Sequence, residues 1–215
     1  MKNLIIIIVL FISIFSIFSQ NLFLTADIWA PYTMDSKDSD NEGILIDVAR
    51  AIFKKKGIII TYEVTPYTRG IKDTKNGNYD GIVGIYKADA LSEGFVVPET
   101  PFGLSVNTFF IKKDDNWKYN NKTKSESLKG RSIGVIQDYI FSEIEDYLQA
   151  NKTSTVEYIS GDSPLETNLK KLINDRISTT IDDEVVINFT AAKLGFIDKI
   201  KPAGSLSDKN ELVIG

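Results

Sequence analysis

The chain has 215 residues, of which 43% are hydrophobic, 11% aromatic and 25% charged. This composition is globular, and it excludes a disordered chain, a collagen-like repeat and a multi-pass membrane protein. Cysteine and histidine are absent, which excludes disulfides, thiolate nucleophiles, Ser-His-Asp catalysis and nearly all zinc sites. The net charge is −4. The chain therefore lacks the surplus of basic residues typical of a nucleic-acid binder, and we expect no nucleic-acid partner.

The first residues resemble a secretion signal. Lys2 precedes one apolar run over residues 4–18, which is shorter than the ~20 residues that span a bilayer as a helix. Ser19 is a small residue at a suitable cleavage point. We therefore predict a cleavable signal peptide over residues 1–19 and a periplasmic protein, and the alternative is an uncleaved anchor. No cysteine follows the run, so we do not expect a lipoprotein.

Residues 22–86 alternate between strand and helix patterns. Residues 44–56 carry apolar side chains at helical spacing, and Gly57 follows as the expected C-terminal cap. We expect strands at 22–28, 58–64 and 80–86, with helices at 44–56 and 67–75 between them. This β-α-β-α-β order predicts a parallel sheet covered by helices.

The alternation stops near Pro98 and Pro101 and later restarts. Ser163 to Glu166 reads as a capping box that opens a helix ending at residue 174. The elements expected here are strands at 105–111, 132–136, 155–159, 177–181 and 211–215, with helices at 140–150, 163–174 and 183–194.

The repeated layout predicts an α/β protein of two lobes joined by an extended crossing. Lobe 1 is expected at residues 20–103, completed by 209–215, and lobe 2 at 104–208. The last expected strand has nothing after it to cover it, which suggests a truncated sequence without C-terminal helices.

In open α/β sheets, ligands bind beyond the carboxyl ends of the strands. Two facing lobes would place these ends around one cleft. Trp29 and Tyr32 flank Pro31 at the first strand end, and their rings could stack on a solute. The alternative role of Trp29 is to seal the sheet edge.

The other strand ends carry further candidate ligand-binding residues. Tyr67 and Arg69 begin a helix, where an arginine opposes the helix dipole and calls for an anion, either a ligand carboxylate or a neighbouring acid. Tyr86 ends a strand, and Tyr139 precedes backbone N–H groups that suit an anion. Three adjacent acids, Asp182 to Glu184, stand where a strand turns into a helix. One of them could simply cap the helix and the others could receive a ligand ammonium group, with Asp183 as the candidate contact.

The case for an enzyme is weak. Asp182 and Asp183 are adjacent, and adjacent acids point in different directions, so they make a poor pair for acid–base catalysis. The sequence has no phosphate-binding glycine loop and no metal motif. We therefore predict no catalytic residues, no cofactor and no metal.

Several segments resemble family 3 of the bacterial periplasmic solute-binding proteins, which serve ABC importers of polar amino acids. They are WAPY at 29–32, EGILID at 42–47, GNYDGIV at 77–83, SLKGRSIGV at 127–135 and DRISTTIDD at 175–183. They occur in family order over nearly all of residues 22–215. The resemblance implies a type II periplasmic-binding fold with its ligand between the lobes.

The resemblance also implies site roles. Trp29 would lie against the ligand and Asp183 would hold its amino group. The family's arginine clamp for the ligand carboxylate has no counterpart in residues 88–94, so Arg69 is the hypothetical replacement. Residues 137–139 read QDY where the family favours Gly-Thr.

The resulting prediction is a monomeric periplasmic protein that captures a small polar, amino-acid-like solute. It would deliver the solute to the membrane permease of an ABC importer. A sensor on the same fold is the alternative, and a periplasmic enzyme of the dehydratase type is a weaker one.

Overall fold

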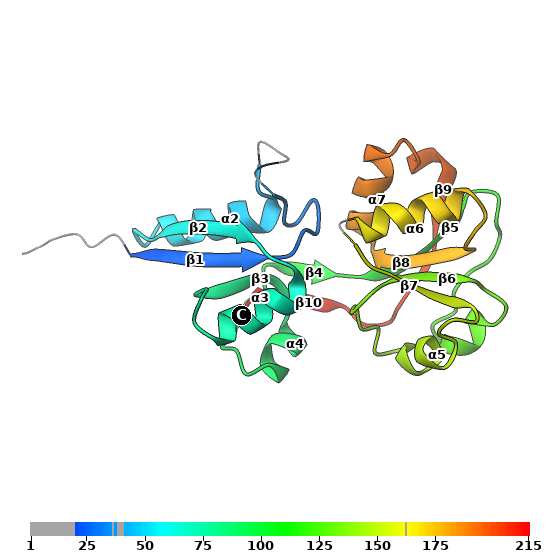
Figure 1. Cartoon of the computed structure of the whole chain (residues 1–215), viewed down its shortest axis with the longest axis horizontal. Helices are drawn as coiled ribbons and strands as arrows, with labels where there is room; N and C mark the ends of the chain where they lie inside the picture. The colour runs from blue at the N-terminus through cyan, green and yellow to red at the C-terminus, as the bar shows by residue number, and fades with distance from the viewer. Residues whose placement is uncertain (1–19, 36, 38–40, 162) are drawn as a thin grey trace, which may run out of the picture.

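The computed structural model describes residues 20–35, 37, 41–161 and 163–215. They form two sheets that lie one after the other along the long axis of the molecule, and each has helices on both faces (Figure 1). We call each sheet with its helices a lobe. The predicted signal peptide lies outside the described residues. Within the described part of the chain, no helix has the length and apolarity needed to cross a membrane.

Lobe 1 is built on the sheet β2-β1-β3-β10-β4. As predicted for the β-α-β-α-β segment, β1 pairs in parallel with β2 and β3, whereas β10 is antiparallel to β3 and β4. The strands are β1 (Asn21–Ala26), β2 (Ile59–Val64), β3 (Gly81–Tyr86), β4 (Gly103–Ser105) and β10 (Asn210–Ile214). The helices are α2 (Ile44–Lys54) on one face and α3 (Tyr67–Lys75) and α4 (Lys87–Ser92) on the other.

Lobe 2 is built on the sheet β7-β6-β8-β5-β9. Its strands are β5 (Asn107–Lys112), β6 (Ile133–Ile136), β7 (Val156–Ile159), β8 (Thr179–Asp183) and β9 (Ile200–Ser205). Helices α6 (Pro164–Ile173) and α7 (Glu184–Lys193) cover one face, and α5 (Glu145–Ala150) covers the other. Two short 3-10 helices are η1 (Lys124–Leu128) and η2 (Ile197–Lys199).

The helices are held by apolar faces at the predicted spacing. In α2, Leu45, Ile46 and Ala49 are buried against Leu24 of β1. In α6, Leu165, Leu169 and Leu172 are buried in the corresponding core of lobe 2. Burying side chains of this kind stabilises a fold by ~1.5–3 kcal/mol each, so each lobe has its own core.

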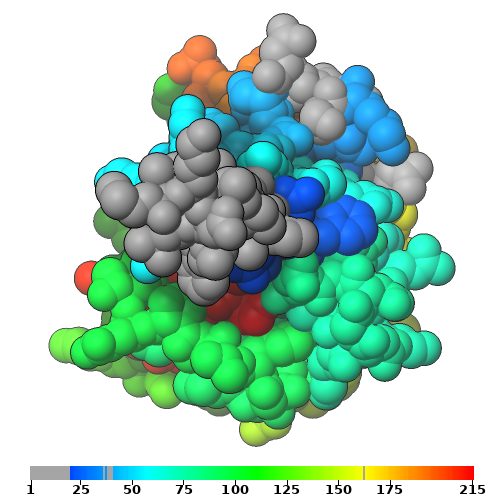
Figure 2. Space-filling model, turned by 90° about the vertical axis from the view of Figure 1, so that its left-hand side faces the viewer, coloured from blue at the N-terminus to red at the C-terminus, as the bar shows by residue number. Residues whose placement is uncertain are grey.

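The lobes are connected twice. Val106 alone separates β4 from β5, and residues 206–209 separate β9 from β10. The predicted lobe boundaries at 103/104 and 208/209 stay predictions. Seen from the free end of lobe 1, the red C-terminal residues lie among earlier segments coloured blue, teal and green (Figure 2).

Some predicted elements were wrong in detail. The helix expected at 140–150 begins only at Glu145, whose carboxylate accepts a hydrogen bond from the backbone N–H of Phe141 and so closes a turn before the helix. Ser163 precedes α6 but makes no capping hydrogen bond with its side chain. Strand β9 and helix α4 were not predicted, because β9 contains Pro202 and Gly204 and α4 has only six residues.

Candidate functional site

The two lobes meet at the ends of their strands, and a direct hydrogen bond joins them there. The indole Nε1 of Trp29 donates to Oδ1 of Asp182 over 3.2 Å. The ring centroid of Trp29 also lies 4.8 Å from the ring centroid of Tyr32 and 6.2 Å from that of Tyr86. Trp29 and Tyr32 pack against the apolar cores of both lobes. Six of the seven predicted site residues interact with one another at this junction, and with Asp27 and Asp182 they form what we call the interlobe cluster: Trp29, Tyr32, Tyr67, Tyr86, Tyr139, Asp183, Asp27 and Asp182.

A tight turn positions Trp29 and Tyr32. The backbone N–H of Trp29 donates to the carbonyl of Thr33 over 2.9 Å, and that of Tyr32 donates to the carbonyl of Trp29 over 2.9 Å. Gly43 packs under this turn with φ of 104°, and a Cβ there would lie 2.4 Å from the carbonyl oxygen of Tyr32. Only glycine fits such a contact, so Gly43 fixes the turn against the start of α2.

Tyr86 and Tyr67 carry hydroxyl groups that make hydrogen bonds, and the hydroxyl of Tyr86 also bonds the side chain of Asn107 in lobe 2. The hydroxyl of Tyr86 lies 3.2 Å from Oγ of Ser105, and that of Tyr67 bonds the carboxylate of Asp89. Burial is the main cause that raises the pKa of both phenols. Both tyrosines therefore stay protonated and uncharged around neutral pH, so each contributes a neutral aromatic ring to the interlobe cluster.

Asp183 is the N-cap of α7. Its Oδ1 accepts hydrogen bonds from the backbone N–H groups of Val185 at 2.8 Å and Val186 at 3.2 Å, and its Oδ2 accepts one from Val106 at 3.2 Å. The hydroxyl of Tyr32 also bonds this carboxylate. Asp183 thus already has the partners that a capping aspartate needs, and its predicted contact with a ligand amino group stays a prediction.

Asp182 is not one of the predicted site residues, although the sequence places it among the three adjacent acids that could receive a ligand ammonium group. It is 1% exposed, and its Oδ1 accepts hydrogen bonds from Trp29 and, over 2.7 Å, from the backbone N–H of Asp183. Its Oδ2 has no hydrogen-bond partner among the described residues. Burial is the largest cause that raises the pKa of Asp182 to about 7. The sequence signal was a charged residue in the buried strand Thr179–Asp183.

Tyr139 contributes an aromatic side chain from lobe 2 to the interlobe cluster. It is half-buried and packs against both apolar cores of lobe 2. Burial raises its pKa, with further contributions from Asp182 of its own lobe and Asp27 of lobe 1. Asp27 is half-buried at the end of β1, and burial raises the pKa of its carboxyl as well.

Arg69 is exposed on the first turn of α3. Its guanidinium makes no hydrogen bond or ion pair with the described residues. The structure therefore does not join it to the interlobe cluster through any contact, and its role as a carboxylate clamp stays a prediction.

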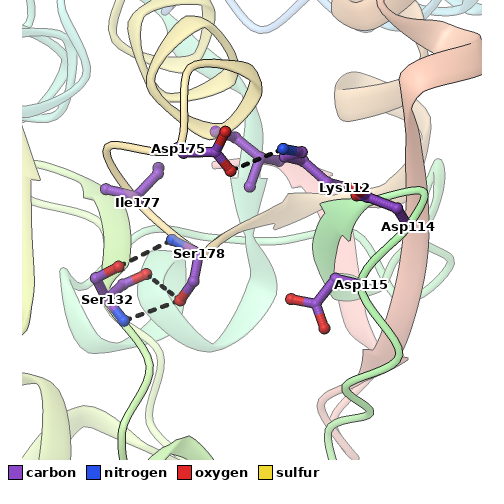
Figure 3. Close-up of a pocket in the computed structure, with 8 residues that line it drawn as sticks. Lys112, Asp114, Asp115, Ser132, Asp175, Ile177 and Ser178 are labelled. Carbon is purple, nitrogen blue, oxygen red and sulfur yellow. Dashed lines mark hydrogen bonds and ion pairs between the residues drawn. The ribbon is translucent and has the colours of Figure 1, made fainter.

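A separate cavity of about 290 Å³ lies at the opposite end of the lobe 2 strands. Figure 3 shows two of its lining residues, Ser132 and Ser178, side by side, with each hydroxyl accepting from the other's backbone N–H over 2.9 Å. The ammonium group of Lys112 lies 2.7 Å from Asp175. The serine hydrogen bonds connect the start of β6 to the start of β8. Because the polar groups of the cavity already bond one another, it is a weaker ligand site than the interlobe cluster.

Within the described ranges, no group of His, Cys, Asp and Glu is arranged to hold a metal ion. The interlobe cluster can instead bind an organic molecule by stacking and charge. Aromatic rings beside carboxylates suit a cationic or amino group.

The comparisons with known proteins agree with this arrangement. Residues 23–186 match the sequence model of the bacterial extracellular solute-binding proteins, family 3. No curated protein sequence matches the chain.

Solved structures show a similar fold. A histidine kinase sensor domain with similarity to periplasmic binding proteins is 16% identical, with a TM-score of 0.71 over 90% of this chain and 81% of that one. An ancestral arginine-binding protein bound to arginine is 18% identical, with a TM-score of 0.69 over 90% of this chain and 83% of the other. An arginine transport system periplasmic binding protein from Legionella pneumophila is 18% identical, with a TM-score of 0.68 over 91% and 85%. At these identities the likeness shows the two-lobed periplasmic-binding-protein fold.

Proposed function

Because the chain belongs to family 3 of the bacterial extracellular solute-binding proteins, we propose that it captures a small polar, amino-acid-like solute between its lobes and delivers it to the permease of an ABC importer. The interlobe hydrogen bond from Trp29 to Asp182 supports this proposal most strongly. It shows that the lobes meet through polar and aromatic groups, which suit a solute better than an apolar seal would.

The cluster offers a distinct contact for each part of such a solute. The rings of Trp29, Tyr32 and Tyr86 would enclose its carbon skeleton. Asp182 and Asp183 would receive its amino group. Arg69 would reach a carboxylate only if closure of the lobes brings it inward, so Arg69→Ala tests that contact.

The rest of the proposal follows from the family and the N-terminal sequence. We propose that residues 1–19 direct the protein to the periplasm and are removed, and that the mature protein acts as a monomer. Binding partners are then a small molecule and a membrane permease. No step of catalysis is proposed, since the matching family and the similar structures are binding proteins and a sensor domain.

A ligand screen tests solute capture. Purified protein is heated with amino acids, small peptides, polyamines and organic acids. A solute at a hundred times its Kd should add ~2.7 kcal/mol to the free energy of unfolding, or several degrees in the melting temperature. A chain that melts cooperatively and responds to none of them would contradict the proposal.

The second candidate function is ligand sensing, which the similarity to a histidine kinase sensor domain favours. A deletion strain separates the two. Loss of uptake of the radiolabelled solute supports delivery to an importer. Unchanged uptake with a lost transcriptional response to the solute supports sensing.

A further inference from the structure

Asp182 has a buried carboxylate oxygen without a partner. The residue is 1% exposed, and both hydrogen bonds that it accepts go to Oδ1. Its Oδ2 has none within the described part of the chain. Leaving a buried acceptor unpaired is unfavourable, so this oxygen is suited to a partner that arrives from outside the chain.

Aromatic side chains from several segments surround this carboxylate. Trp29 donates to it, and the ring of Tyr32 packs against that of Trp29 at an interplanar angle of 47°, with 4.8 Å between ring centroids. The Asp182 carboxylate also lies close enough to raise the pKa of Tyr32, Tyr86 and Tyr139. Aromatic faces attract organic cations, most strongly where water is excluded.

The described chain supplies no cation to Asp182. Burial is the largest influence on the pKa of its carboxyl. The groups that also affect this pKa are the backbone of Asp183, the indole of Trp29 and the Asp183 carboxylate, and none of them is basic. Lys87 is paired with Glu211 at 2.7 Å, and Arg69 is exposed on α3. Asp27 adds a further acid at the same junction. The cluster therefore holds an excess of negative charge that a cationic ligand would balance.

From this arrangement we infer that the solute is an organic amine whose ammonium group pairs with Oδ2 of Asp182, and that the site does not require a carboxylate on the solute. The inference rests on the proposed capture of a solute between the lobes and narrows its class. It assigns the leading anionic contact to Asp182 in place of the capping Asp183, whose oxygens already have partners. A free carboxylate on the solute would meet Asp27 and Asp183 rather than a clamp.

Matched pairs of amines and amino acids test this inference. Calorimetric titration of the purified protein would compare putrescine with ornithine, cadaverine with lysine, and agmatine with arginine, which differ only by the α-carboxylate. At least one amine should bind, and it should bind as tightly as its amino acid or more tightly. If an amino acid binds tenfold more tightly than its amine, the inference is wrong while solute capture stands. If no amine in the panel binds, the inference is also wrong, and binding of any other solute then decides the proposed function separately.

Asp182→Asn removes the charge and keeps the size of the side chain. We expect it to weaken binding of the amine at least tenfold. Glu184→Gln is the matched control, because Glu184 is exposed two residues further on and its loss changes the net charge equally. The control should leave the Kd of the amine within twofold. Equal Kd values for wild type and Asp182→Asn, with both proteins melting cooperatively, would overturn the role of Asp182.

Discussion

Trp29 and Asp182 are 153 residues apart in the chain and joined by a hydrogen bond of 3.2 Å between their side chains. This bond links the turn that follows β1 in lobe 1 to the carboxyl end of β8 in lobe 2. Any motion that separates the lobes must break it, so the indole is placed to report on the state of the junction.

Tryptophan fluorescence should therefore follow ligand binding. The chain has two tryptophans, and Trp117 lies inside lobe 2, where its Nε1 donates to the carbonyl of Ser127 over 3.0 Å. Trp117→Phe should keep a ligand-dependent change in emission, and Trp29→Phe should abolish it. The opposite pattern would place the ligand away from the interlobe cluster.

Trp29→Phe should also lower stability. It keeps most of the ring packing and removes the N–H donor to Asp182. A hydrogen bond to a charged group contributes ~1.5–3 kcal/mol, so the melting temperature should fall by a few degrees. Thermal unfolding without ligand measures this, and an unchanged melting temperature would show that the bond contributes nothing.

Asp182→Asn should stabilise the free protein at neutral and alkaline pH. Burial raises the pKa of Asp182 from 3.8 to about 7. Between those pH values the folded chain holds a proton that the unfolded chain has lost, so stability falls as the pH rises and the full loss is reached above pH 7. The loss is about 4 kcal/mol at most, and asparagine avoids it.

Melting curves at pH 5 and pH 8 measure that effect. The gain from Asp182→Asn should be several degrees larger at pH 8 than at pH 5. Glu184→Gln is the control, since it removes a neighbouring carboxylate that is exposed. A lower melting temperature for Asp182→Asn at pH 8 would mean that the carboxylate is stabilised in the free protein.

Amine binding should strengthen as the pH rises to about 7 and then level off. Below the raised pKa of Asp182 the carboxyl must lose its proton before it can pair with an ammonium group. The apparent Kd should therefore fall about tenfold per pH unit on the acid side. The groups facing Asp182 are Asp183 on its own strand, Trp29, Tyr32 and Tyr86 from lobe 1, and Tyr139 from lobe 2.

Burial raises the pKa of these tyrosines, so they do not titrate near neutral pH. Calorimetry between pH 5.5 and pH 8.5 would follow the change. A flat profile would show that Asp182 is ionised throughout that range.

Gly43→Ala should disturb the Trp29–Tyr32 turn. The added Cβ would lie 2.4 Å from the carbonyl oxygen of Tyr32, in a backbone conformation with φ of 104°. Strain of this kind costs ~1–3 kcal/mol before the clash is counted. Gly77→Ala is the control, because Gly77 has φ of 78° with nothing within 4 Å. Gly43→Ala should lose more stability and more ligand affinity than the control, and equal losses would show that the contact is unimportant.

The sequence predicted the order of most elements because apolar periodicity and turn residues are local signals. The parallel pairing of β1, β2 and β3 followed from the β-α-β-α-β order. Asp182 was not singled out from the neighbouring acids because its importance is non-local. It depends on the burial of β8 and on the reach of Trp29 across the lobes, and neither is visible in the segment TTIDD.

The same distinction explains the aromatic candidates and Arg69. Trp29, Tyr32 and Tyr86 were found because each stands at a strand end, and parallel strands bring such ends together. Arg69 also stands at a helix start, but the direction of a long side chain is decided by its surroundings, and here it extends into solvent.

The position of β10 has a consequence for the order in which the protein folds. This strand comes last in the chain and lies between β3 and β4, and β4 has no other partner in its sheet. Lobe 2 is formed by the continuous segment from β5 to β9, so it can fold while residues 210–214 are still to be made. Lobe 1 must wait for a contact between segments more than a hundred residues apart, which makes closure of its sheet the slow step.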